Sequence, residues 1–149
     1  MPRIVPADLP EHSGSFYLPP HDDAVAGRHW RAIASAAGLT QFGANLVTLI
    51  PGGWSSQRHW HSHEDELVVM LSGEAVLVED DGETLLRAGD IAAFAAGTAN
   101  GHHLQNRSTA PATFLAIGTD DPERDECHYP DIDMHLGPSG FTIKTARPA

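Results

Sequence analysis

The chain is poor in basic residues. Of its 149 residues, nine are Lys or Arg and 20 are Asp or Glu, which gives a formal net charge of -11 at pH 7. Nucleic acids and anionic membranes bind through basic surfaces, so we expect neither as a partner. The single cysteine, Cys127, excludes an intramolecular disulfide.

Long apolar runs are also absent. No segment approaches the roughly 20 apolar residues that a transmembrane helix needs. The start of the sequence, MPRIVPADLPEHSG, contains no apolar core of a signal peptide. We therefore expect a cytoplasmic protein with no membrane partner.

The composition is otherwise that of one folded domain. An apolar fraction of 41% and a charged fraction of 19% are typical of globular proteins, and 14 Gly with 11 Pro indicate many turns. The length suits a single hydrophobic core. Histidine is the unusual residue, because ten are present.

Three parts of the chain differ in pattern. Residues 1–42 are expected to form an N-terminal arm, because prolines interrupt residues 1–27 and exclude a long helix or central strand there. The run HWRAIASAAG, residues 29–38, predicts one short helix that ends at Gly38. Residues 43–118 form the predicted barrel core. The acidic residues 119–149 are expected to pack on that barrel as an extension, with a final strand FTIKT at residues 141–145.

The core consists of short apolar runs separated by Gly and Asp. Each run has about six residues, which is near the mean length of a strand rather than of a helix. Asp80-Asp81-Gly82 predicts a hairpin, since glycine supplies the positive φ of a tight turn. No segment between the runs is long enough for the helix of a parallel crossover. The sequence therefore predicts an all-β sandwich or barrel. The predicted strands are NLVTLI, ELVVML, EAVLVED, ETLLRA, DIAAFA, HHLQN and ATFLAIG.

Two histidines in one of these segments have the spacing of metal ligands. His59 and His61 are two residues apart, so on a strand they face the same side, while Arg58 and Trp60 face away. Glu66 begins the next strand, and an antiparallel return would bring its carboxylate beside both imidazoles. Such a ligand set suits a divalent transition metal and leaves coordination positions open.

This segment resembles the first motif of the cupin superfamily: glycine, five residues, His-x-His, three or four residues, Glu, six residues, Gly. Gly53, His59, His61, Glu66 and Gly73 fit it at every position. The run from Gly89 to Gly97 resembles the first half of the second motif. Residues 55–61 and 129–133 look like those of small stand-alone cupins without an assigned reaction. The resemblance implies a jelly-roll barrel (a double-stranded β-helix), often a homodimer, with one metal ion inside.

The resemblance also implies a fourth ligand near the second motif, for which there are two candidates. His102 keeps the family's His-to-Asn spacing with Asn106, whereas two extra residues after Gly97 leave His103 as the alternative. On a strand the two rings face opposite sides, so only one can point inward. Two arguments favour His102: the family's His-to-Asn spacing, and strand alternation, which puts His102 on the same side as Leu104 and Asn106.

The predicted function is metal-dependent chemistry on a small oxygen-rich metabolite, a sugar or a keto or hydroxy acid. The same ligands can hold Fe, Mn, Ni, Co or Zn, so isomerase, lyase and dioxygenase reactions all stay open, as does a non-catalytic binding or sensing role. Isomerisation needs a proton carrier, and the candidates are His63, Tyr129 and Tyr17. Parity predicts that the pocket is lined by Gln57, Val47 or its neighbour Asn45, Met70 and Asn106.

A phosphorylated substrate is slightly disfavoured, because Lys144 is the sole lysine and Arg58 should point outward. Arg28, Arg31 and Arg107 stay open as clamps for an anion.

Overall fold

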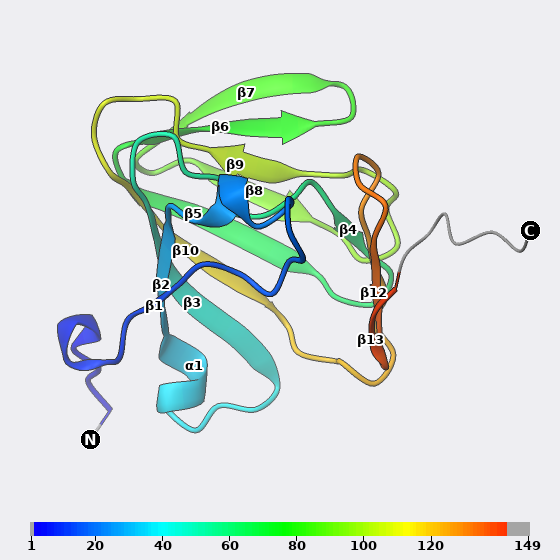
Figure 1. The fold of residues 1–149 in the computed structure, drawn as a ribbon. Coiled ribbons are helices and arrows are strands. Elements are labelled where there is room, and N and C mark those ends of the chain that lie inside the picture. Colours follow the sequence, from blue (N-terminus) through cyan, green and yellow to red (C-terminus); the bar gives the residue numbers. More distant parts are fainter. Residues whose placement is uncertain (1, 143–149) are drawn as a thin grey trace, which may run out of the picture.

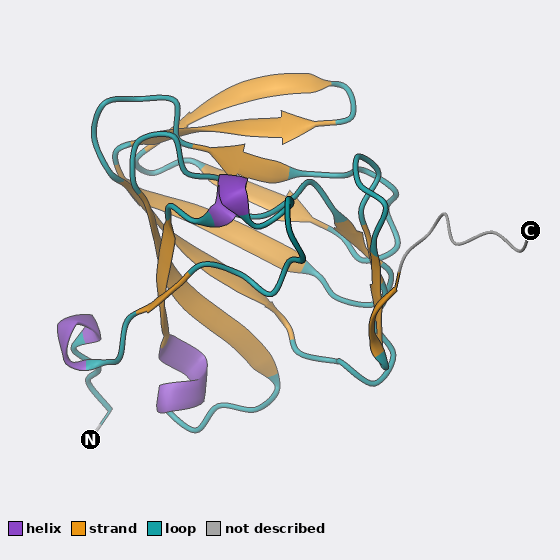
Figure 2. Ribbon diagram, viewed as in Figure 1, coloured by secondary structure: helices purple, strands orange, loops and turns teal. Residues whose placement is uncertain are grey.

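The β-rich pattern that the sequence predicts is confirmed in the computed structural model, which describes residues 2–142 (Figures 1 and 2). Helix is confined to three short segments: η1 (Pro6–Asp8), η2 (Asp23–Val25) and α1 (Ile33–Ala36). The strands are β1 (His12–Ser13), β2 (Arg28–Ala32), β3 (Phe42–Leu49), β4 (Trp60–His61), β5 (Glu66–Ser72), β6 (Glu74–Glu79), β7 (Gly82–Arg87), β8 (Ile91–Phe94), β9 (His103–Gln105), β10 (Ala112–Thr119), β11 (Cys127–His128), β12 (His135–Gly137) and β13 (Gly140–Thr142).

The longest strands form a six-stranded sheet in the order β1-β2-β3-β10-β5-β8. β10 pairs along its full length with β3 on one side and over residues 113–118 with β5 on the other. Every pair in this sheet is antiparallel, as expected for a chain without helices between its strands.

A three-stranded sheet, β7-β6-β9, lies on the other side of the molecule (Figure 1). Its β6–β7 hairpin confirms the predicted pairing of EAVLVE with ETLLR, with Glu79 opposite Gly82. Gly82 has φ +146°, a backbone conformation that other residues rarely adopt. A third sheet, β13-β12-β11-β4, forms a narrow ribbon at one end of the barrel.

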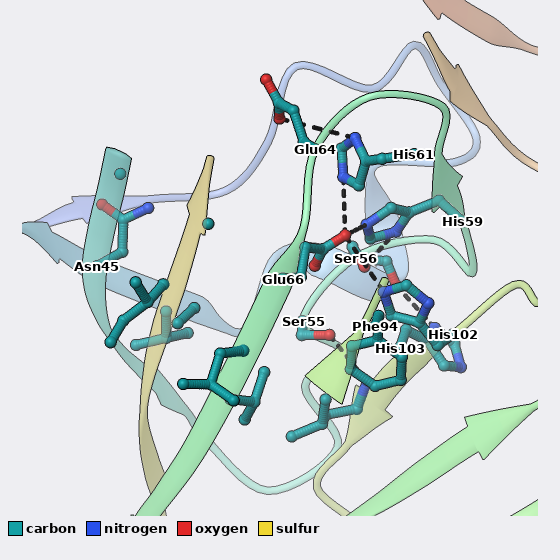
Figure 3. A pocket seen from close by; sticks show the side chains of 18 of the residues that line it. Asn45, Ser55, Ser56, His59, His61, Glu64, Glu66, Phe94, His102 and His103 are labelled. Atoms are coloured by element: carbon teal, nitrogen blue, oxygen red, sulfur yellow. Dashed lines mark hydrogen bonds and ion pairs between the residues drawn. The ribbon is translucent and has the colours of Figure 1, made fainter. Parts of the chain in front are cut away.

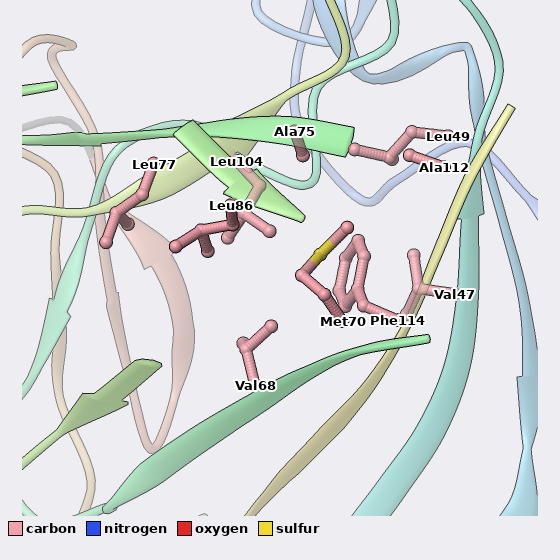
Figure 4. Close-up of a cluster of buried hydrophobic side chains, with 10 residues drawn as sticks. All are labelled: Val47, Leu49, Val68, Met70, Ala75, Leu77, Leu86, Leu104, Ala112 and Phe114. Carbon is pink, nitrogen blue, oxygen red and sulfur yellow. The ribbon is translucent and has the colours of Figure 1, made fainter. Parts of the chain in front are cut away.

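The hydrophobic core lies between the first two sheets (Figure 4). Inward residues alternate with outward ones along each strand, so the two inner faces together supply one apolar cluster. Leu49 and Ala112 are fully buried in it. The cluster comprises Val47, Leu49, Val68, Met70, Ala75, Leu77, Leu86, Leu104, Ala112 and Phe114.

The turn between β5 and β6 depends on Gly73. Its φ is +70°, and a Cβ at this position would lie 2.9 Å from the Cα of Ala112. A larger residue would strain the backbone and clash with β10. This glycine is the last position of the motif that the sequence shares with cupins.

The predicted short helix is wrong over most of its length. Arg28–Ala32 is the strand β2, which pairs with β1 and with β3, and α1 covers only Ile33–Ala36. Pairing on both edges outweighs the helix propensity of the alanine-rich sequence. Gly38, with φ +75°, ends this segment as predicted. The predicted final strand begins as β13, but its residues 143–145, which include Lys144, lie outside the described part of the chain.

In the described residues, none of the helices is long and apolar enough to span a membrane.

Candidate metal centre

Three segments of the chain bring the four predicted ligands together. His59 and His61 lie at β4, Glu66 at the start of β5, and His102 just before β9. A bridge joins His59 to His102: each backbone N–H donates to the other's carbonyl, at 3.2 and 2.9 Å. Glu66 arrives by a different route from the one predicted, because β4 pairs with β11 in the ribbon and not with β5.

The three imidazoles point at one carboxylate oxygen (Figure 3). Glu66 Oε1 lies 3.2 Å from His59 Nε2, 2.8 Å from His61 Nε2 and 3.2 Å from His102 Nε2. Ligand atoms of His59, Glu66 and His102 lie within 4.8 Å of one another. These residues could therefore hold a metal ion through nitrogen and oxygen donors.

The far side of each ring fixes the tautomer that such a site needs. The Nδ1 atoms of His59 and His102 face the carbonyl oxygens of Gln57 and Asn100, at 2.9 and 3.0 Å. His61 Nδ1 lies 2.6 Å from Asp125 Oδ2. A proton held on Nδ1 by these acceptors leaves the Nε2 lone pair free for a metal. The residues present thus fit a divalent transition metal.

The charges of the site are strongly coupled. Burial would raise the pKa of Glu66, but hydrogen bonds from His102, His59 and His61 hold it well below its usual value. Burial likewise lowers the pKa of His61, but Glu66 and Asp125 more than compensate and raise it to about 9. The cluster therefore attracts positive charge, either a proton or a metal cation.

A cavity of about 340 Å³ opens beside the cluster. His59, His61, Glu66 and His102 all line it, together with Val47, which the sequence predicted. Its wall also includes Arg28, Asn45, Ser55, Ser56, Glu64, Phe94, His103 and Asp120.

The other three residues predicted to line the pocket lie outside this wall. Met70 belongs to the hydrophobic core. Asn106 is fully buried, and its Nδ2 donates to the carbonyls of Leu49 and Ala110. Gln57 donates to the carbonyl of His21. The amides of Asn106 and Gln57 thus hold backbone groups rather than a ligand.

His102 and His103 occupy different environments. The ring of His102 stacks on Phe94, with 3.6 Å between ring centroids, and its Nε2 faces Glu66. His103 instead donates from Nδ1 to the carbonyl of Ser56, at 2.8 Å, and packs edge-on against Trp54. The geometry brings His102, and not His103, to the Glu66 carboxylate.

The predicted proton carriers lie at unequal depth. His63 is exposed in the loop after β4, with Nδ1 2.7 Å from Ser62 Oγ. Tyr129 is 4% exposed and its ring lies 5.9 Å from that of His59. Tyr17 packs edge-on against Tyr129. Both tyrosines line a neighbouring cavity of about 300 Å³, and burial raises the pKa of each.

Asp125 and Cys127 are the site residues that sequence reasoning missed. Asp125 binds His61 from 64 positions away in the sequence. Cys127 pairs with His61 across β11 and β4, and its sulfur lies within 4.8 Å of ligand atoms of His59 and His61. Burial raises the pKa of the Cys127 thiol to about 12, so the thiol is protonated and a poor nucleophile at neutral pH.

Comparison with known proteins agrees with this geometry. A family model described as a cupin domain matches residues 45–118. A sugar phosphate isomerase of the cupin superfamily from Silicibacter pomeroyi DSS-3 is 43% identical; the match covers 99% of this chain and 96% of that chain, with a TM-score of 0.91.

Two further solved structures share the fold. A candidate sugar phosphate isomerase from Acidithiobacillus ferrooxidans is 26% identical over 82% of this chain and 80% of that chain, with a TM-score of 0.73. The oxalate decarboxylase of Lactobacillus farciminis, at 20% identity and a TM-score of 0.56, matches 80% of this chain and 33% of its own length. No curated protein sequence matches the chain.

Proposed function

The chain belongs to the cupin superfamily, and we propose that it is a metal-dependent isomerase of a small sugar-like metabolite. The observation that supports this most directly is the convergence of three imidazole Nε2 atoms on the Glu66 carboxylate, at the wall of a cavity. The 43% identical sugar phosphate isomerase favours isomerisation over the other reactions that cupins carry out.

His59, His61, Glu66 and His102 would hold one divalent transition metal per chain. When bound, the metal supplies a Lewis acid that polarises a carbonyl or hydroxyl oxygen of the substrate. Asp125 holds the His61 ring by its Nδ1, so that Nε2 keeps its direction toward the cavity. Phe94 covers one face of His102 and excludes water from that side.

Isomerisation also needs a group that moves a proton between neighbouring carbons. Glu64 lines the cavity and is not one of the four proposed ligands. Its Oε2 accepts a hydrogen bond from the backbone N–H of Asp121 at 2.8 Å, which fixes the carboxylate, and burial raises its pKa. We add Glu64 to Tyr129 and His63 as a third candidate proton carrier. Of the three, Glu64 is the one that lines the cavity with the proposed ligands.

The experiment uses protein purified without a nickel column and analysed for metal content. Aldoses, ketoses and their phosphates are incubated with it in D2O, and NMR follows conversion and deuterium incorporation. Interconversion with deuterium at the exchanged carbon supports the isomerase. Oxygen consumption without isomerisation would instead indicate a dioxygenase, and saturable binding without turnover would indicate a sensing protein.

A further inference from the structure

Arg28 places a positive charge inside the barrel. Arg28 pairs with Leu49 and Trp30 with Val47 across β2 and β3, so all four side chains share one face of the sheet. Leu49 and Val47 on that face are fully buried in the core. The guanidinium of Arg28 therefore lies on the inner face, and it lines the cavity that contains the metal ligands.

Among the described residues, this guanidinium has no carboxylate partner and no side-chain hydrogen bond. Burial lowers the pKa of Arg28, as expected for a desolvated cation without a counter-ion. The Arg28 side chain is half-buried at the cavity wall, and a partly desolvated charge without a counter-ion favours the binding of an anion. Five other arginines do have a carboxylate within 4.0 Å: Arg31, Arg58, Arg87, Arg107 and Arg124.

Trp30 lies against the guanidinium. The Cζ atom of Arg28 lies 4.3 Å from the centroid of the Trp30 ring, so one face of the cation is covered by the indole. The N–H groups of a guanidinium lie in its plane, at the edge rather than at the face. Stacking therefore leaves the donor edge available for an oxyanion, which arginine binds with two parallel hydrogen bonds.

Two neutral donors lie with Arg28 where two cavities adjoin. Arg28, Asn45 and Ser55 line both the cavity of about 340 Å³ and the neighbouring one of about 300 Å³. Ser55 Oγ accepts a hydrogen bond from the backbone N–H of Leu104, so its own hydroxyl proton is left to donate. Figure 3 shows Asn45 on β3, across the cavity from the histidine rings.

We propose that Arg28, Asn45 and Ser55 form an oxyanion subsite, which holds a phosphate or carboxylate group of the substrate while its carbonyl end reaches the histidines. The assignment of this group to a substrate rests on the proposed function; the subsite itself does not. Of the three clamps that the sequence left open, Arg31 is paired with Glu11 and Arg107 with Glu83, so Arg28 is the one that the structure favours.

The test measures anion binding without turnover. Inorganic phosphate and acetate are titrated separately into the metal-loaded protein by calorimetry, and the tighter probe identifies the preferred oxyanion. The variants are Arg28→Gln, Arg28→Lys and, as matched control, Arg107→Gln, whose arginine is paired on the surface. A metal-free protein carrying His59→Ala and His61→Ala separates binding at Arg28 from binding at a metal ion.

We expect Arg28→Gln to weaken binding of the preferred probe on the order of 10-fold or more, Arg28→Lys to weaken it less, and Arg107→Gln to leave it unchanged. Metal content and thermal unfolding should stay as in the unaltered protein, and the metal-free variant should still bind. Equal affinity in Arg28→Gln, loss of binding in the metal-free variant, or no binding of either probe would overturn the subsite. Anion binding that depends on Arg28, in a protein that isomerises no sugar, would refute the proposed function alone.

Discussion

At the histidine end of the cavity, both nitrogens of each proposed ligand imidazole have a partner within the protein, whereas at the other end the Arg28 guanidinium contacts the Trp30 ring but has no carboxylate or hydrogen-bond partner among the described residues. The first end is organised before any ligand arrives, because the chain supplies an acceptor for every Nδ1–H. At the second end no carboxylate of the described residues lies against Arg28, and we propose that a bound anion supplies the counter-charge. We propose that this difference separates two tasks within one cavity: holding a metal ion permanently and binding a substrate reversibly.

Removing two imidazoles at once should have the largest effect. His59→Ala with His61→Ala leaves only Glu66 and His102 of the proposed ligands, so we expect metal content to fall from about one ion per chain to none. Elemental analysis after purification without a nickel column measures this loss. His29→Ala is the matched control, because His29 pairs with Glu11 away from the cavity. Stoichiometric metal in the double variant would show that the assignment of the site is wrong.

A smaller effect distinguishes the two neighbouring histidines. His102→Ala removes one ligand of four, and we expect metal affinity to fall on the order of 100-fold. His103→Ala removes a ring that binds the Ser56 carbonyl, so the change should stay below about threefold. Competition with a chelator of known affinity measures both. A larger loss at His103 would show that the strand presents its other face to the metal.

The clustering of the first three proposed ligands could be predicted from the sequence because these residues lie close together in it. His59 and His61 share a face by strand alternation, and Glu66 follows His61 after a short loop at the start of the next strand. The predicted β4–β5 pairing was nevertheless wrong, since β4 belongs to the ribbon with β11. The carboxylate instead reaches the imidazoles without any pairing of β4 with β5, which periodicity alone cannot reveal.

At the arginine end the sequence left Arg28 as one of three candidate clamps and could not choose among them, because the residues of this end meet only through long-range pairing. Propensity favoured a helix over part of the segment that forms β2, and only pairing with β1 and β3 makes it a strand that turns Arg28 inward. Asp125 is similar, since it reaches His61 through the β4–β11 ribbon from an acidic segment without periodicity. Strand alternation also predicts which side of the sheet a side chain faces, but not how far from the cavity it lies. Met70 and Asn106 therefore face inward without reaching the cavity.

Asp125 should have a more modest effect than a ligand. Asp125→Asn keeps the size of the side chain but weakens the acceptor for His61 Nδ1–H, so we expect metal affinity to fall about 10-fold. Asp90→Asn is a suitable control, because Asp90 accepts a hydrogen bond from the backbone N–H of Arg87 in a distant turn. Chelator competition again provides the measurement. Unchanged affinity in Asp125→Asn would mean that the His61 ring is held by packing alone.

The smallest expected effect is a dependence of stability on pH in the metal-free protein. Glu66 and Asp125 raise the pKa of His61 to about 9, against the opposing effect of burial, whereas in the unfolded chain it returns to a value near 6.5. A group with a raised pKa stabilises the fold fully below its unfolded pKa, and that contribution is lost as pH rises toward the folded pKa. The pKa of Glu66 is lowered, so its contribution to stability is lost only in acid. Between pH 7 and 8.5 that contribution is complete and constant. We therefore expect the free energy of unfolding in urea to fall on the order of 1 kcal/mol between pH 7 and 8.5.

Two further measurements assign this pH dependence to His61. Asp125→Asn should flatten it, because one of the two carboxylates that raise the pKa of His61 is removed. Bound metal should abolish it, since the ring is then already deprotonated and the proton no longer contributes to stability. A metal-free protein that is equally stable at pH 7 and 8.5 would show that the His61 ring is neutral before metal binds. The histidine end would then be completed by its hydrogen bonds alone, and a bound cation would displace no proton from it.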